Sequence, residues 1–123
     1  ATIRVIEAAG FDCLISDNRF LDVLPKGISK GPSLLRLLDA RRRAREVVLV
    51  AGDTLNDLSL FETGLKGVAV GNSEQGLMEK VAGRDNVHVA QSHGAGGVLE
   101  AIDRFGFADI VARAIETEIE VPA

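Results

Sequence analysis

The sequence predicts an α/β protein with a parallel, Rossmann-like sheet and flanking helices, on three observations. Val47 to Ala51 is an unbroken apolar run, which is typical of a strand buried on both faces of a helix-covered parallel sheet. Gly52 ends this run, and a polar cluster at positions 53–57 follows at once. Two further short apolar runs, 67–71 and 87–90, alternate with helical patterns. In open α/β sheets ligands bind at the carboxyl ends of the strands, which is where this cluster lies.

The N-terminal part has a different pattern from the rest of the chain. Residues 1–10 carry apolar side chains at helical spacing and end in a glycine. Residues 11–15 and 19–24 are predicted strands joined by a turn at Asp17–Asn18. We therefore expect a helix followed by an antiparallel hairpin, with a boundary at Pro25–Gly27.

Capping residues and glycines place the remaining helices. Ser29 is a polar cap candidate with Pro32 early in the first turn, and the arginines between positions 41 and 45 are assigned to the last turn, where cations suit the helix dipole. Asn72 and Gln75 have the spacing of a capping box. The predicted helices cover residues 29–45, 58–64, 72–81, 94–105 and 107–118.

Composition and charge exclude several classes of protein. The 123 residues amount to one domain, and 46% hydrophobic with 26% charged residues is ordinary for a globular protein. A net charge of −4 argues against general nucleic-acid binding. No apolar run approaches the ~20 residues that a membrane span needs. The single cysteine allows no intrachain disulfide and fits a cytoplasmic location.

The polar cluster after the central strand combines two carboxylates and a carboxamide, from Asp53, Asp57 and Asn56. These oxygen ligands suit Mg²⁺, which takes one or two carboxylates and keeps its other positions for water and substrate phosphate. We expect Asp53 to bind the metal directly, Asn56 to contact phosphate or a metal-bound water, and Asp57 to orient them. The alternative is that the cluster only caps the following helix.

Lys30, His88 and His93 are further polar candidates. Lys30 follows the hairpin and begins a helix, so its ammonium would reach across the sheet edge to a phosphate near Asp53. An ordinary surface lysine is the alternative, and position alone favours it. His88 lies within a strand pattern and is predicted to be structural, while His93 lies in a loop at the ligand edge.

The segment Gly52-Asp-Thr-Leu-Asn-Asp57, preceded by Lys30-Gly31, resembles the second half of a phosphatase of the haloacid-dehalogenase (HAD) superfamily. The chain is most similar to the branch with an α/β cap inserted late in the core, which includes sucrose-phosphate phosphatases and Cof-type sugar phosphatases. The likeness extends over residues 22–107. It implies that residues 1–25 are the C-terminal remnant of the cap and that residues 26–123 are the second half of a HAD-like core.

The resemblance also implies an activity. The protein would be a Mg²⁺-dependent phosphatase that hydrolyses a sugar phosphate, such as a sucrose-phosphate-like disaccharide phosphate, through an aspartyl-phosphate intermediate. Lys30 and Asp53 would be catalytic residues. Lys30 and Asn56 would bind the phosphate, and Asp53 and Asp57 would form the metal site.

One part of the family pattern is not in the chain. The family carries its nucleophile in an Asp-x-Asp motif near the N-terminus, and these residues contain no Asp-x-Asp. Together with the first residue, which is Ala1 and not a methionine, this leads us to expect the C-terminal piece of a longer phosphatase, inactive alone. Its sheet would lack the nucleophile strand and would pair with the N-terminal half or self-associate.

Two other classes of function remain open. A receiver-like phosphoacceptor domain, phosphorylated on Asp53, fits the length and the aspartate at a strand end, but the acidic pair after a first buried strand is missing. A non-catalytic accessory domain of a sugar-transferring enzyme is the second, with the acidic cluster acting only as a cap.

Overall fold

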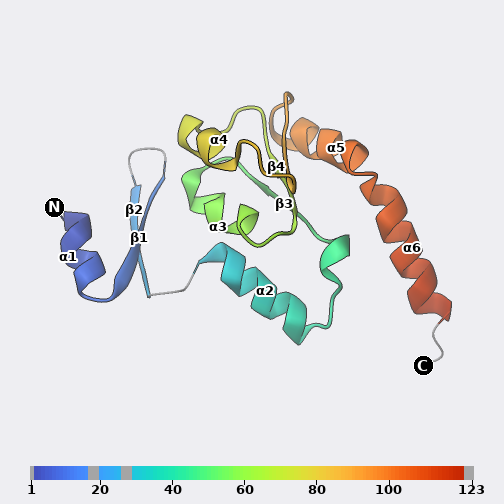
Figure 1. Cartoon of the computed structure of the whole chain (residues 1–123), viewed down its shortest axis with the longest axis horizontal. Helices are drawn as coiled ribbons and strands as arrows, with labels where there is room; N and C mark the ends of the chain where they lie inside the picture. Colours follow the sequence, from blue (N-terminus) through green and yellow to red (C-terminus); the bar gives the residue numbers. More distant parts are fainter. Residues whose placement is uncertain (1, 17–19, 26–28, 121–123) are drawn as a thin grey trace.

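The computed structural model describes residues 2–16, 20–25 and 29–120. Its N-terminal part is the predicted helix and antiparallel hairpin, at the left of Figure 1: α1 (Thr2–Ala8), β1 (Phe11–Ser16) and β2 (Phe20–Pro25). The turn predicted at Asp17–Asn18 lies outside the described residues, as does most of the predicted boundary after Pro25.

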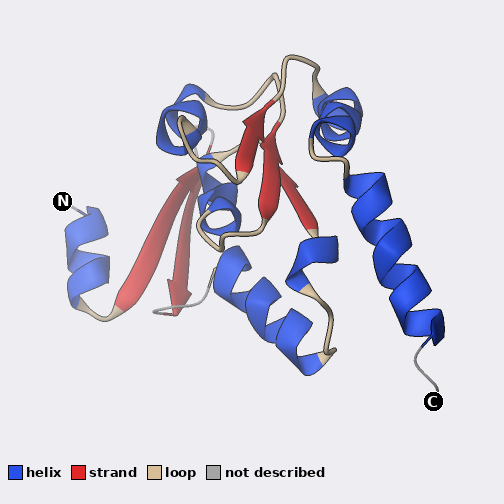
Figure 2. Ribbon diagram, turned by 45° about the vertical axis from the view of Figure 1, so that its right-hand side comes forward, coloured by secondary structure: helices blue, strands red, loops and turns tan. Residues whose placement is uncertain are grey.

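The rest of the chain is built on a parallel three-stranded sheet in the order β3-β4-β5. The strands are β3 (Leu49–Gly52), β4 (Lys66–Ala69) and β5 (Val87–Val89). Gly52 pairs with Ala69, and Ala69 pairs with Val89, so all three strands end at the same edge of the sheet (Figure 2). The α/β prediction with a parallel sheet is confirmed.

Helices cover both faces of this sheet. Two 3₁₀ turns flank β3 along the chain, η1 before the strand and η2 after it. The helices α2, α3 and α4 lie on one face and α5 on the other, while α6 continues from α5 and contacts η1 (Figures 1 and 2). Their bounds are α2 (Lys30–Ala40), η1 (Arg45–Val47), η2 (Leu55–Asp57), α3 (Leu58–Phe61), α4 (Gln75–Val81), α5 (Gly94–Arg104) and α6 (Phe107–Glu120).

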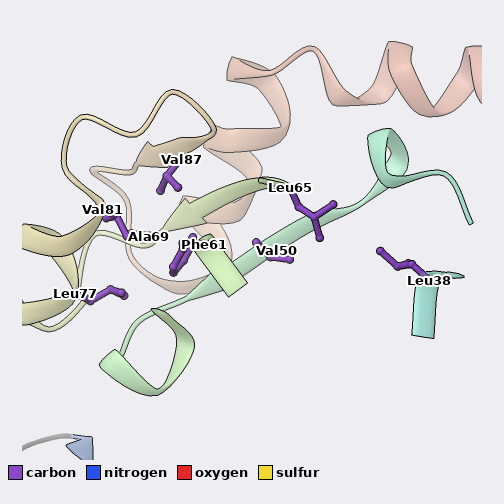
Figure 3. Packing of buried hydrophobic residues seen from close by; sticks show 8 residues of the cluster. All are labelled: Leu38, Val50, Phe61, Leu65, Ala69, Leu77, Val81 and Val87. Carbon is purple, nitrogen blue, oxygen red and sulfur yellow. The ribbon is translucent and has the colours of Figure 1, made fainter. Parts of the chain in front are cut away.

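Most of the buried core lies on the face covered by α2, α3 and α4. Phe61 and Leu77 are fully buried there, next to Val50 and Val81 (Figure 3). Burying side chains of this size is worth about 1.5–3 kcal/mol each. The smaller cluster on the α5 face is built around Val68. The larger cluster therefore supports the turn after β3, which carries the predicted site.

The central strand is shorter and more open than its sequence predicts. It begins at Leu49, because Arg45–Val47 form η1, and Ala51 is exposed. The expectation of burial on both faces holds only in part for β3: Val50 packs in the larger cluster and Leu49 against the smaller one, but Ala51 is open to solvent. The reason is its position: among the described residues β3 pairs only with β4, so it is an edge strand of this sheet.

Two helix ends also differ from the prediction. The arginines do not lie in the last turn of α2, because that helix ends at Ala40 and Arg41 is its C-cap. Arg42 then adopts a left-handed backbone, with a φ of 51°, and this turns the chain away from the helix. At the other helix, Glu74 rather than Asn72 precedes α4, so the predicted capping box is wrong.

Candidate functional site

The turn after β3 is fixed around the carboxylate of Asp57. Its Oδ2 accepts the backbone N–H groups of Asp53 at 3.0 Å and Thr54 at 3.2 Å. Thr54 and Asp57 form a capping box at η2, so the capping alternative describes part of what this cluster does. A Cβ atom on Gly52 would lie 2.5 Å from the Cβ of Asp57, so glycine is required where the strand ends.

Lys30 reaches this turn from the first residue of α2. Its Nζ donates to Oδ1 of Asp57 at 2.6 Å, across 27 positions of sequence. The side chain of Asp57 is 9% exposed and that of Lys30 is 49% exposed, so the pair lies at the surface of the site with its carboxylate covered. Lys30 is thus not an isolated surface lysine.

The charge on Asp57 is stabilised by these contacts. Burial by itself would raise the pKa of Asp57, but the hydrogen bond from Lys30 and the N–H groups of Asp53 and Thr54 outweigh it, and the pKa of Asp57 is lowered. Asp57 is therefore ionised at neutral pH and holds the ammonium of Lys30 in place.

The lowered pKa of Asp57 predicts a pH dependence of stability. Asp57 has a pKa below the ordinary value of 3.8, so its contribution is complete above pH 4 and is lost as the pH falls through the folded-state pKa. We expect Asp57→Asn to lower the free energy of unfolding at pH 7 by about 1–3 kcal/mol. The difference from the wild type should shrink as the pH is lowered below 3.8 and Asp57 becomes protonated in the folded state. Urea unfolding at pH 7 and at a series of lower pH values measures this.

Asp39→Asn is the matched control for that measurement. Asp39 is exposed on α2, and its Oδ1 lies 3.6 Å from a guanidinium nitrogen of Arg45, which is an exposed ion pair. We expect a change within ±0.5 kcal/mol at pH 7. If the free energy of unfolding of Asp57→Asn falls with acid as steeply as that of the wild type, then the ionised Asp57 carboxylate does not stabilise the fold as we assign.

A contact between α2 and α3 places Lys30. The N–H of Gly31 donates to Oγ of Ser59 at 2.9 Å, which satisfies one of the free N–H groups in the first turn of α2. A Cβ atom on Gly31 would lie 2.1 Å from the carbonyl oxygen of Ser59, so only glycine allows this approach. The sequence analysis missed Ser59, because a single serine in a helical segment carries no signal for such a contact.

Asp53 presents the free carboxylate of the site. Its side chain is exposed and makes no hydrogen bond or ion pair within the described residues, while its carbonyl oxygen accepts the N–H of Glu74 at 2.7 Å. Asn56 is half-buried in η2, three residues further on. The structure therefore brings all four predicted site residues to one turn and one helix start, at the carboxyl edge of the sheet.

The donor set fits part of a magnesium site. A free carboxylate at Asp53 is the kind of ligand that Mg²⁺ takes, whereas both oxygens of Asp57 already accept hydrogen bonds. Across residues 2–16, 20–25 and 29–120, no group of three or more His, Cys, Asp or Glu side chains is placed to hold a metal. The remaining positions on a metal here would fall to water and phosphate.

The other polar candidates lie further along the same edge. Asn72 accepts the N–H of Gly94 at 3.2 Å, and His93 is the exposed N-cap of α5. His88 pairs with Glu100 through its Nε2 atom.

None of the helices in the described ranges is long and apolar enough to cross a membrane.

Comparison with known families identifies this arrangement. The family model of sucrose-6F-phosphate phosphohydrolase matches residues 4–106, which is most of the chain. The chain belongs to the sucrose-6F-phosphate phosphohydrolase family. The resemblance to HAD superfamily phosphatases of the sucrose-phosphate phosphatase type is thus confirmed.

Relatives of this sucrose-6F-phosphate phosphohydrolase family member carry two kinds of name. A glucosylglycerol-phosphate synthase from Pseudomonas anguilliseptica is 47% identical, over 85% of this chain and 14% of its own length. A mannosylfructose-phosphate phosphatase from Agrobacterium fabrum is 34% identical, over 80% of this chain and 41% of its own length.

A solved structure shares the fold of this family member closely. The sucrose-phosphatase from Synechocystis, determined in complex with sucrose and phosphate, is 30% identical with a TM-score of 0.79, over 85% of this chain and 44% of the other. The chain thus spans less than half the length of each of these relatives.

Proposed function

We propose that the protein containing this chain is a Mg²⁺-dependent phosphatase that hydrolyses a sugar phosphate through an aspartyl-phosphate intermediate. The observation that carries the proposal is the pairing of Lys30 with the buried Asp57 beside the free carboxylate of Asp53. The pairing fixes a cation where parallel strands end, and the exposed carboxylate of Asp53, in the same turn, would serve as the metal ligand. Positioned charge of this kind stabilises the transition state of phosphoryl transfer to and from the nucleophile.

Each residue has a separate role in this proposal. Asp57 holds Lys30, and the ammonium of Lys30 binds the phosphate and stabilises the charge on its oxygens. Asp53 would hold Mg²⁺ directly, with Asp57 supporting the metal side through the turn that they share, and Asn56 would bind the phosphate. When bound, Mg²⁺ supplies further charge that neutralises the transferring phosphoryl group.

The domain assignment is part of the proposal. Residues 1–25 are the C-terminal remnant of a cap, and residues 26–123 are the second half of a HAD-like core. In support, β1 of the hairpin lies beside η2, so the hairpin approaches the site residues. The nucleophile would come from the N-terminal half of the protein, which would pair next to the open edge of β3. Without that half, the chain would cover this edge by self-association. We place the protein in the cytoplasm.

Phosphate release from a panel of sugar phosphates tests the function. The complete polypeptide that carries this chain is incubated with Mg²⁺ and sucrose phosphate, mannosylfructose phosphate or glucosylglycerol phosphate, and free phosphate is measured. We expect release from one of these to exceed the others clearly and to stop when EDTA removes the metal. Release from none of them would overturn the proposal.

A second candidate function is a non-catalytic accessory domain of a sugar-transferring enzyme. The 47% identity to a glucosylglycerol-phosphate synthase favours it, because this chain matches only 14% of that protein. A complete polypeptide that forms a sugar phosphate but releases no phosphate from it would establish this candidate. The receiver-like alternative is set aside, because the first two strands form an antiparallel hairpin and the family is one of phosphohydrolases.

A further inference from the structure

Glu100 on α5 holds the loop that follows β5. Its Oε2 accepts the N–H of Gln91 at 3.1 Å and contacts Nε2 of His88 at 2.5 Å. Its Oε1 lies 3.4 Å from the backbone nitrogen of Ser92, which also donates to it. One side chain thus provides acceptors for two successive backbone N–H groups of the loop, those of Gln91 and Ser92. These contacts lower the pKa of Glu100, the bond with His88 contributing most.

The same loop is joined to the turns after the other two strands. Gly71, at the end of β4, donates its N–H to the carbonyl oxygen of Ser92 at 2.8 Å. A Cβ atom on Gly71 would lie 2.3 Å from the carbonyl oxygen of Gln91, so the two segments are in direct contact. The β4 turn is in turn held to the β3 turn, because Glu74 donates to the carbonyl oxygen of Asp53 at 2.7 Å.

This loop faces the edge at which the candidate site lies. It presents three consecutive exposed polar side chains, from Gln91, Ser92 and His93, at the carboxyl end of β5. Lys30, the first residue of α2, and Asp53, in the turn after β3, lie on the far side of the sheet from this loop, because β4 separates β3 from β5. Lys30 is held by its bond to Asp57, and the backbone of Asp53 is held by the same carboxylate. The loop is therefore placed to meet the part of a bound molecule that extends away from the phosphate.

We propose that Glu100 is a positioning residue: it fixes the loop 91–93, and this loop forms part of the surface that binds the sugar moiety of the substrate. The inference rests on the proposed function. Glu100 acts as a hydrogen-bond acceptor for the loop N–H groups, and His88 orients its carboxylate. On the phosphate side of the site, Lys30 and the turn after β3 are held by Asp57 and not by Glu100.

Two substitutions separate the acceptor role from the charge. Glu100→Ala removes both acceptors from the loop. Glu100→Gln keeps one oxygen for the N–H groups of Gln91 and Ser92 and turns its amide toward Nε2 of His88, which accepts a hydrogen bond in one tautomer. The glutamine variant is therefore expected to rescue what the alanine variant loses. Glu79→Ala is the matched control, because Glu79 is exposed on α4 and its side chain, within the described residues, hydrogen-bonds to Gln75 alone.

Amide hydrogen exchange on the complete polypeptide that carries this chain tests the contact directly. In Glu100→Ala, exchange at Gln91 and Ser92 is expected to accelerate about tenfold, as the loss of one hydrogen bond implies, with amides of β4 unchanged. Glu100→Gln and Glu79→Ala should remain within about twofold of the wild type. Unchanged exchange in the alanine variant, or equal acceleration in the glutamine variant, would overturn the acceptor role.

Steady-state kinetics of the complete polypeptide test the functional part. With the best sugar phosphate of the panel, Glu100→Ala is expected to raise KM about five- to tenfold and to leave kcat within about twofold, and Glu100→Gln to restore KM. An unchanged KM, or a fall in kcat alone, would overturn the positioning role. Gly71→Ala is a second variant in case Glu100→Ala folds poorly. Its added methyl group would push against the carbonyl oxygen of Gln91 and displace the loop, so this variant should also raise KM.

The exchange measurement and the kinetic measurement can each give a negative result without the other, so they distinguish a failure of this inference from a failure of the proposed function. A wild-type polypeptide without hydrolytic activity refutes the proposed function and with it the role in sugar binding. The exchange experiment still decides in that case whether Glu100 holds the loop. Accelerated exchange with an unchanged KM refutes the inference and leaves the phosphatase proposal standing.

Discussion

Asp53→Ala is expected to abolish phosphate release by the complete polypeptide, with a fall in kcat of at least about 10³-fold. The physical reason is that Asp53 presents the free carboxylate of the site, which we assign to Mg²⁺. Charge stabilisation by a catalytic metal is worth several kcal/mol, and each 1.36 kcal/mol is about tenfold in rate. Phosphate release at saturating sugar phosphate and Mg²⁺ measures the change.

The same substitution should leave the fold intact. The side chain of Asp53 is exposed and makes no hydrogen bond or ion pair within the described residues, so we expect the free energy of unfolding to change by less than about 0.5 kcal/mol. Asp103→Ala is the matched control, because Asp103 is an exposed aspartate on α5 and should keep full activity. A fully active Asp53→Ala variant would show that Asp53 holds no catalytic metal.

Lys30→Met is the second substitution with a large expected effect. It keeps the length of the side chain and removes the charge, so we expect kcat to fall about 10²–10³-fold, as when one donor to a developing oxyanion is lost. It also leaves Asp57 buried without its cation. Because the side chain of Lys30 is half-exposed and water partly screens its charge, we expect a loss in stability of only about 1–2 kcal/mol.

A double substitution separates these two effects. Lys30→Met combined with Asp57→Asn removes the unpaired charge, so stability should recover relative to the sum of the single changes while activity stays lost. Lys80→Met is the control, since Lys80 is exposed on α4. Additive losses in stability, or a Lys30→Met enzyme within threefold of the wild-type kcat, would contradict the assigned pairing.

Much of the fold follows from local pattern. The apolar runs placed all three strands of the parallel sheet, and the N-terminal helix and hairpin were predicted in their observed order. The predicted bounds are wrong at the start of β3, which is an edge strand, and at the end of α2, where the chain reverses direction. Val47 is apolar enough for a strand but lies in η1, and the arginines after Ala40 follow α2 instead of ending it.

From the residues alone, the site could be predicted only where its members are neighbours in the sequence. Asp53, Asn56 and Asp57 are neighbours in sequence, so their cluster was visible directly. Lys30 was assigned to the phosphate from the family resemblance, because position alone favoured a surface lysine. The structure adds its bond to Asp57. Ser59 and Glu100 were missed, because each acts through backbone N–H groups that only the folded chain brings to it.

Mg²⁺-dependent phosphate release by the 123-residue chain alone, compared with the complete polypeptide, tests the central claim most directly. The claim is that these residues supply the metal and phosphate side of a phosphatase site whose nucleophile lies elsewhere. We expect release from a sugar phosphate by the complete polypeptide and none by the chain alone. Release by the chain alone that Asp53→Ala abolishes would contradict the claim and place a nucleophile within these residues.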